Sequence, residues 1–231
     1  MNQKAIIIGA SSGIGKELAK VLSNHGFIVG LTGRRIDLLI ELQSEIKNNS
    51  FIKQMDISKP SKAMNLLDEL IEDMKGIDLI VISAGVGFIN PELEWHKEND
   101  TIAINVTGFT AMANVAMKRF ISQKSGHLVG ISSIAALTGD YEAPSYNASK
   151  AFISNYMEGL RKKVKQLKLP ITITDVKPGF VDTAMAQGEK LFWVASPQKA
   201  AKQIYQVINK RKNHAYITKR WRLIAWLLKI T

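Results

Sequence analysis

A tyrosine and a lysine lie four residues apart in the segment Y-N-A-S-K, residues 146–150. On a helix, residues at i and i+4 project from one face, so Tyr146 and Lys150 would lie side by side. A neighbouring ammonium group favours the phenolate and lowers the pKa of the phenol. Such a tyrosine can donate or accept a proton near neutral pH. By itself, however, the pair is more often a half-buried tyrosine and a solvated lysine on an ordinary helix.

Short apolar segments alternate with segments of helical periodicity along the chain. The alternation predicts an α/β fold, a doubly wound parallel sheet of the Rossmann type in a single domain, with ligands bound beyond the carboxyl ends of the strands. The predicted strands are residues 4–10, 27–33, 51–56, 77–85, 126–133, 171–179 and 214–218. The predicted helices are residues 15–26, 36–47, 60–74, 100–121, a helix that carries Tyr146 and Lys150 to about 168, and residues 196–211.

The segment G-A-S-S-G-I-G, residues 9–15, joins the first predicted strand to its helix. Gly9, Gly13 and Gly15 permit a tight turn and a close approach of the backbone to a ligand. The helix N-terminus behind them favours a diphosphate. A purely structural turn is the alternative, but the strand–turn–helix context favours dinucleotide binding.

Two arginines follow the second predicted strand, in T-G-R-R, residues 32–35. Sites that prefer NAD place an acidic residue here to bind the ribose 2′-hydroxyl, whereas this chain has Gly33. The guanidinium groups of Arg34 and Arg35 match a 2′-phosphate in charge and geometry. Two solvated arginines at a helix start would oppose the helix dipole. The motif therefore favours NADP(H) over NAD.

Taken in order, these motifs resemble those of the short-chain dehydrogenase/reductase family over residues 4–217. Ser133 precedes Tyr146 by 13 residues, which is the family spacing. The further motifs are S-A-G (83–85), N-V-T-G (105–108), I-S-S (131–133) and P-G-F-V-D-T (178–183). One departure is Ser83, where the family commonly has an asparagine that helps to tie the central strands together.

The resemblance implies a catalytic set of Asn105, Ser133, Tyr146 and Lys150. Tyr146 would exchange a proton with the substrate oxygen, and Ser133 would hold that oxygen. Lys150 would bind the nicotinamide ribose and lower the pKa of Tyr146. Asn105 would anchor a water that relays protons from Lys150. An unperturbed phenol is a poor base at pH 7, so the lysine and the cofactor's positive ring must supply the shift.

The resemblance also implies which residues hold the cofactor. Asp56 would contact the adenine edge and Thr183 the carboxamide end. The full predicted set is Gly9, Ser11, Ser12, Gly13, Ile14, Gly15, Arg34, Arg35, Asp56, Ile57, Ala84, Gly85, Tyr146, Lys150, Pro178, Gly179, Val181 and Thr183.

Variable loops form the substrate pocket in this family. The residues expected there are Met185, Leu191, Phe192 and Trp193 from the segment 184–197, together with Val86, Phe88, Ile89 and Tyr141. They suit an apolar or aromatic carbonyl compound, although the same side chains would also serve to cover the core. The predicted function is NADP(H)-dependent interconversion of a carbonyl and an alcohol. The alternative is a non-catalytic NADP(H)-binding sensor or scaffold.

The composition suits one globular domain. The chain has 231 residues, of which 46% are hydrophobic and 22% charged, as in soluble proteins. It has no cysteine, which excludes disulfides and thiolate metal sites and fits the cytoplasm. The four histidines lack the spacing of metal ligands, so we expect no metal. No apolar run reaches the length of a signal peptide or a spanning helix.

The net charge of +11 is concentrated at the C-terminal end. Residues 161–231 contain 16 Lys and Arg but only three Asp and Glu. This asymmetry predicts either an anionic partner or a solvated basic face. Residues 1–218 are expected to form the oxidoreductase domain and residues 219–231 a basic amphipathic tail. The tail suits an anionic membrane surface, a partner subunit or its own domain.

Nucleic acid is not an expected partner, because no recognition motif accompanies the basic charge. The resemblance implies instead a homodimer or homotetramer, formed through the two helices that hold Asn105 and Tyr146.

Overall fold

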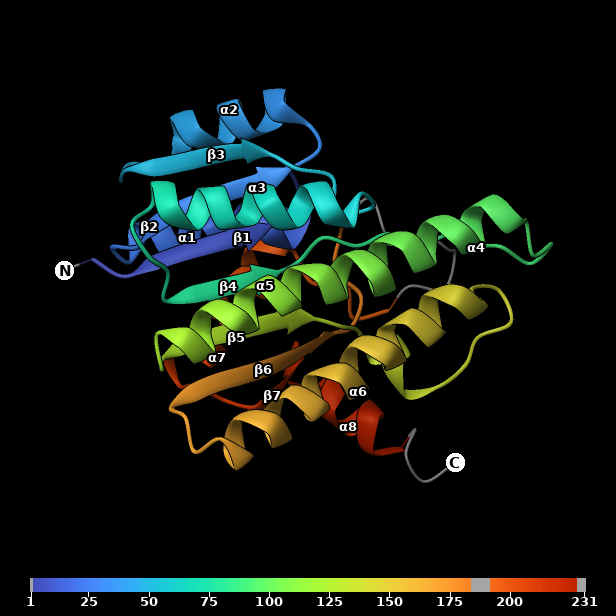
Figure 1. Cartoon of the computed structure of the whole chain (residues 1–231). Helices are drawn as coiled ribbons and strands as arrows, with labels where there is room; N and C mark the ends of the chain where they lie inside the picture. The colour runs from blue at the N-terminus through green and yellow to red at the C-terminus, as the bar shows by residue number, and fades with distance from the viewer. Residues whose placement is uncertain (1, 184–191, 228–231) are drawn as a thin grey trace.

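The predicted strands form one seven-stranded parallel sheet in the computed structural model, which describes residues 2–183 and 192–227 (Figure 1). The strand order is β3-β2-β1-β4-β5-β6-β7. In register, Ile6 of β1 lies between Gly30 of β2 and Ile80 of β4. The strands are β1 (Lys4–Ile8), β2 (Ile28–Gly33), β3 (Ser50–Gln54), β4 (Leu79–Ile82), β5 (Gly126–Ile131), β6 (Ile171–Pro178) and β7 (His214–Ile217).

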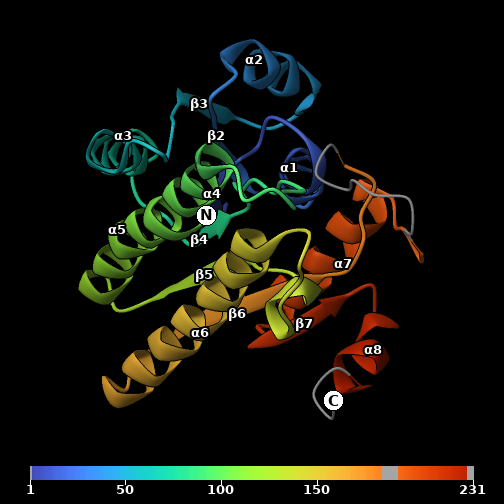
Figure 2. The ribbon, with the colours of Figure 1, turned by 90° about the vertical axis from the view of Figure 1, so that its right-hand side faces the viewer.

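Helices cover both faces of this sheet and make it a three-layer single domain. Helices α3, α5 and α6 lie on one face, and α1 and α7 lie on the other (Figure 2). The helices are α1 (Gly13–Asn24), α2 (Ile36–Glu45), α3 (Pro60–Asp73), α4 (Trp95–Thr101), α5 (Phe109–Ser122), α6 (Pro144–Gln166), α7 (Pro197–Asn209) and α8 (Trp221–Leu227), with a π-helix η1 (Ile102–Gly108) and a 3₁₀ helix η2 (Ile134–Leu137).

The core consists of two apolar layers, one on each face of the sheet. Strand β1 contributes to both, because successive side chains of a strand point to opposite faces. Ile6 and Ile8 pack in the layer beneath α3, α5 and α6, whereas Ala5 and Ile7 pack in the layer beneath α1 and α7. Burial on both faces explains why the strands read as continuous apolar runs.

The topology places a ligand site between β1 and β4. From β1 the chain proceeds outward to β2 and β3 and then returns to β4, on the other side of β1. The connections after β1 and β4 therefore leave the sheet in opposite directions and open a crevice at the carboxyl ends. Backbone bonds close the base of this crevice, since the amides of Ser83 and Ala84 both donate to the Ile8 carbonyl at 2.8 Å. These bonds tie the central strands although Ser83 lacks an amide side chain.

The helix predicted for residues 100–121 is three consecutive segments instead. It begins earlier, at Trp95, with α4, continues through the π-helix η1 and ends as α5. The first segment lacks an apolar stripe, and Trp95 is 72% exposed, so periodicity gave no signal for it. The π-helix contains Asn105, and such segments are frequent at functional sites.

Candidate active site

The glycine turn after β1 has the shape that a diphosphate site requires. Gly9 has a φ of 93° and Gly13 a φ of 57°, both in the left-handed region. A Cβ at Gly9 would lie 2.6 Å from the amide nitrogen of Ala84, so only glycine fits there. A Cβ at Gly15 would collide with the Gly9 carbonyl, so this glycine lets α1 pack against the turn. The residues present fit a dinucleotide whose phosphates lie at the N-terminus of α1.

Arg35 crosses from the end of β2 to the glycine turn. Its guanidinium donates to the hydroxyl of Ser11 at 3.0 Å and to that of Ser12 at 2.8 Å. Arg34 is exposed beside it. A cation and two hydroxyls are thereby gathered at the place where the adenosine ribose of a dinucleotide would lie.

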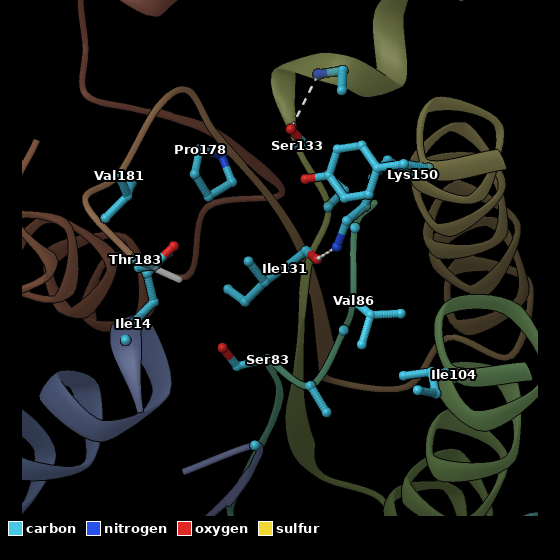
Figure 3. Close-up of a pocket in the computed structure, with 18 of the residues that line it drawn as sticks. Ile14, Ser83, Val86, Ile104, Ile131, Ser133, Lys150, Pro178, Val181 and Thr183 are labelled. Carbon is cyan, nitrogen blue, oxygen red and sulfur yellow. Dashed lines mark hydrogen bonds between the residues drawn. The ribbon is translucent and has the colours of Figure 1, made fainter. Parts of the chain in front are cut away.

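Ser133, Tyr146 and Lys150 line the same cavity as the glycine turn, a single space of about 1120 Å³. Ser133 follows β5, and its hydroxyl oxygen accepts a hydrogen bond from the amide of Ala135 at 3.1 Å (Figure 3). Tyr146 lies in the first turn of α6, one turn before Lys150, and the Lys150 ammonium lies 5.6 Å from the centre of the tyrosine ring.

Lys150 is 4% exposed and donates to the carbonyl of Ile131 at 3.2 Å (Figure 3). Burial lowers its pKa to about 8, against an opposing effect of the Asp175 carboxylate. Burial raises the pKa of Tyr146, and the Ser133 hydroxyl opposes that rise. The lowering of the Tyr146 pKa that we expected from Lys150 is therefore not present in the chain alone.

Asn105 is fully engaged in holding the site together. Its amide nitrogen donates to the carbonyl of Val86 at 2.7 Å and to the hydroxyl of Ser149 at 2.9 Å. Its oxygen accepts from the amide of Val86 at 2.9 Å. These bonds connect η1 to the loop after β4 and to α6. With these partners, the Asn105 side chain braces the site, and the relay water expected at this residue stays a prediction.

The cavity lining brings together most of the predicted cofactor residues. In Figure 3, Ile14, Pro178, Val181 and Thr183 lie on one side of the open space, and Val86 and Ile104 on the other. Asp56 also lines the cavity, and one of its oxygens accepts from the amide and hydroxyl of Ser58 at 3.0 and 2.8 Å. Further predicted residues that line it are Ser11, Ser12, Arg34, Arg35, Ile57, Ala84, Gly85 and Gly179. Gly15 and Asn105 do not line it.

Comparison with known proteins identifies the family of this chain. A model of the short chain dehydrogenase family matches residues 3–191. An uncharacterized oxidoreductase of Myxococcus xanthus is 34% identical over 186 residues, which are 78% of this chain and 73% of the relative. The chain belongs to the short-chain dehydrogenase/reductase family. It is an NAD(P)-dependent oxidoreductase.

Solved structures of other proteins share the fold of this chain. A short chain dehydrogenase/reductase from Burkholderia phymatum, in complex with NAD, superposes with a TM-score of 0.88 at 19% identity and covers 98% of this chain and 92% of its own. A short-chain dehydrogenase from Sphingobium yanoikuyae, in complex with NADPH, has a TM-score of 0.82 at 20% identity, with 97% and 93% covered. The structural neighbours therefore bind either nicotinamide dinucleotide.

The cavity also has lining residues that sequence reasoning missed, and together with the predicted substrate-pocket residues they form what we call its substrate half. Phe180, Trp221 and Ile224 line it together with the predicted Val86, Phe88, Ile89, Tyr141 and Phe192. Met185 and Leu191 lie outside the described residues. Trp221 had been assigned to the tail, yet it is 2% exposed and packs edge-on to Phe180 with 5.4 Å between ring centres. One face of α8 therefore packs on its own domain, which is one of the three roles considered for the tail.

Two glycines make room for the aromatic side chains of this site. A Cβ at Gly87 would lie 2.8 Å from the ring of Tyr146, so a side chain there would displace the tyrosine. A Cβ at Gly179 would overlap the indole of Trp221. Gly179 belongs to the motif P-G-F-V-D-T, but nothing in the sequence connects it with a tryptophan 42 residues later.

Proposed function

We propose that this protein is an NADP(H)-dependent reductase that interconverts an apolar carbonyl compound and its alcohol. The observation that carries the proposal is the single cavity. It joins the glycine turn and Arg35 at one end to Ser133, Tyr146 and Lys150 in its interior. When bound, the dinucleotide supplies the hydride to the carbonyl carbon, or accepts it from the alcohol.

The side chains of the chain itself manage the substrate oxygen and its proton. Ser133 donates its hydroxyl proton in a hydrogen bond to the carbonyl oxygen and fixes its position. Tyr146 transfers its phenolic proton to that oxygen as the hydride reaches the carbon, so that a C–H and an O–H bond form together. In the opposite direction the Tyr146 phenolate removes the proton from the alcohol.

Lys150 would help to stabilise the phenolate of Tyr146. In the chain alone, burial keeps the pKa of Tyr146 above its ordinary value, so the phenolate requires positive charge nearby. The Lys150 ammonium and the positive ring of a bound cofactor would supply that charge together, and the same ammonium can donate hydrogen bonds to ribose hydroxyls. A water relay at Asn105 would have to use the backbone carbonyl, because the side chain is occupied by Val86 and Ser149.

The preference for NADP(H) is inferred from Arg35, Ser11 and Ser12. A 2′-phosphate placed among them would accept hydrogen bonds from a guanidinium and two hydroxyls, and charge-assisted bonds of this kind are strong. Arg35→Ala should weaken NADPH binding by about 10- to 100-fold and leave NADH binding nearly unchanged. Equal losses for the two dinucleotides, measured by fluorescence titration, would contradict the preference.

The proposed substrate is a lipophilic ketone, aldehyde or alcohol, because the substrate half of the cavity is lined by apolar and aromatic side chains. Two further proposals concern association and place. The chain is expected to form a homodimer or homotetramer through α5 and α6, with the exposed Phe152 on α6 as one contact. The cytoplasmic setting remains a prediction of the sequence.

The decisive experiment is NADPH oxidation with a panel of apolar ketones at neutral pH. Tyr146→Phe should lower turnover by about 10²- to 10⁴-fold and leave NADPH affinity nearly unchanged, since only the proton donor is removed. Tyr156→Phe is a matched control on the same helix, where the ring packs on Phe109 and Phe152 away from the cavity. Wild-type turnover in Tyr146→Phe would refute the assigned role. Tight NADPH binding without reduction of any carbonyl would favour the sensor.

A further inference from the structure

Helix α8 has two faces with different environments. Trp221 and Ala225 are each 2% exposed, and Trp221 and Ile224 line the substrate half of the cavity. On the opposite face Leu223 and Trp226 are both 60% exposed, and Leu227 is 48% exposed. The helix is thus a wall of the cavity that also presents large apolar side chains to the outside.

The exposed apolar surface continues around the cavity rim. Phe192 and Trp193 are 48% and 39% exposed, and their ring centres lie 5.1 and 6.0 Å from that of Trp221. We call Phe192, Trp193, Leu223, Trp226 and Leu227 the rim surface. The buried Trp221 lies between Phe192 and Trp193 on one side and the exposed residues of α8 on the other. Exposed apolar groups concentrated on one side of a cavity mark an interaction surface more often than scattered ones do.

Basic side chains border the rim surface. Lys219, Arg220 and Arg222 are exposed, and residues 219–227 contain no acidic residue. The Arg220 guanidinium lies 5.3 Å from the centre of the Trp193 ring. Tryptophan and leucine beside lysine and arginine suit the interface of an anionic bilayer, where the rings enter the headgroup region and the cations meet phosphates.

We propose that the rim surface docks on an anionic lipid bilayer and turns the mouth of the cavity toward it. The substrate would then be a long-chain carbonyl compound that resides in the bilayer. This part of the proposal rests on the proposed function. The protein would remain peripheral, because no helix in residues 2–183 and 192–227 is long and apolar enough to span a membrane.

A second copy of the chain fits this surface less well. In a two-fold interface the same patch meets itself, so Lys219, Arg220 and Arg222 of both copies would be brought together. Like charges at close range oppose association, whereas anionic headgroups neutralise them. The charge of the surface therefore favours lipid over self-association.

Vesicle flotation of the full-length protein tests the docking without any need for turnover. We expect binding to vesicles of phosphatidylglycerol and phosphatidylcholine, and little to phosphatidylcholine alone. The double variant Leu223→Asp/Trp226→Asp should bind at least about tenfold more weakly. Trp95→Asp is the matched control, because Trp95 is an equally exposed tryptophan on α4 and should leave binding unchanged. Unchanged NADPH affinity would show that each variant is folded.

Two results would overturn the docking. One is equal flotation of the wild type and the double variant. The other is a wild type that fails to float but forms a dimer, with the double variant sedimenting as a monomer, since the rim surface would then be a subunit interface.

A second arm tests the substrate class by comparing a long-chain ketone held in anionic vesicles with a short water-soluble ketone. The double variant should lose about tenfold in activity toward the first and retain activity toward the second. Equal losses for both ketones would overturn delivery from the bilayer. Reduction of neither ketone by the wild type would refute the proposed function, while flotation would still decide the docking.

Discussion

Two buried lysines, Lys150 and Lys177, differ in what surrounds them. Lys177 is 7% exposed and forms an ion pair with Asp175, its neighbour on the same face of β6. The same carboxylate accepts hydrogen bonds from Ser132 at 2.5 Å and from Ser154 at 2.6 Å. Lys150 is 4% exposed, yet its ammonium donates to a neutral carbonyl, that of Ile131, and it faces the cavity.

The difference distinguishes a structural charge from a chemical one. Burial pushes the pKa of Asp175 upward, but Lys177, Ser132 and Ser154 together hold it below its ordinary value. The Asp175 carboxylate is thus enclosed by Lys177 and the two serines. Among the residues that the structure describes, Lys150 forms no ion pair, so burial lowers its pKa to about 8, and the ammonium protons not donated to Ile131 are left for a ligand. The buried charge of Asp175 is thus neutralised within the fold, whereas that of Lys150 faces the cavity, where the proposed reaction would use it.

The largest effect should come from Lys150→Met. Turnover should fall by about 10²- to 10⁴-fold, because Tyr146 loses the charge that stabilises its phenolate. The free energy of unfolding at pH 7 should not decrease, because a desolvated charge without a carboxylate partner is removed. Steady-state NADPH oxidation and urea unfolding measure the two. Turnover within tenfold of the wild type would mean that Lys150 is no more than a structural lysine.

Lys177→Met should show the opposite pattern. It leaves the Asp175 carboxylate buried without its cation and should cost about 3–5 kcal/mol in the free energy of unfolding. The fraction of this variant that remains folded should retain the turnover of the wild type. The double variant Asp175→Asn/Lys177→Met removes both charges and leaves no buried carboxylate without a cation, so it should be more stable than Lys177→Met alone. Additive losses in this double-mutant cycle would show that the pair is not coupled.

The lowered pKa of Lys150 also predicts how stability depends on pH. Between pH 8 and 10.5 the unfolded chain keeps a proton on this lysine that the folded chain has lost, so the contribution to stability rises with pH. The contribution of Lys150 to the free energy of unfolding is fully present above pH 10.5 and is lost as the pH falls through about 8. The change over this range is about 3 kcal/mol. Urea unfolding of the wild type and of Lys150→Met across this pH range isolates the contribution, as the difference between the two free energies of unfolding. Parallel curves would indicate an unperturbed lysine.

The smallest effect should come from Ser154→Ala, one turn beyond Lys150 on α6. It removes one hydrogen bond to the Asp175 carboxylate and should cost about 1–2 kcal/mol in the free energy of unfolding at pH 7. Since the pKa of Asp175 is lowered in the folded chain, the loss should shrink as the pH falls below about 4. Turnover should be unchanged. A large loss of turnover would mean that the two lysine sites are coupled through α6.

Local patterns in the sequence were sufficient to predict most of the fold, the glycine turn and the pair Tyr146 and Lys150. The apolar runs predicted all seven strands, and the glycines with their strand and helix predicted the dinucleotide turn. The pair Tyr146 and Lys150 followed from a spacing of four on a helix. Each of these features depends on residues close in sequence, where chain geometry alone fixes which side chains share a face.

The rest depended on contacts between distant segments. The sequence placed Trp221 in a tail, and only the docking of α8 beside Phe180 made it a wall of the cavity. It gave no sign that the packing of η1 against α6 would bring the Asn105 side chain to Ser149. Asp175 carried no signal in the sequence, because its two serine partners come from the residue after β5 and from α6.

The sequence by itself determined which elements form and the family, because these depend on short-range periodicity and on the order of motifs along the chain. The tertiary structure decided which buried charges are paired, which aromatic residues line the cavity and which face of α8 remains outside. Those outcomes depend on the order of strands in the sheet and on how helices pack upon it, which bring together residues that no local pattern relates.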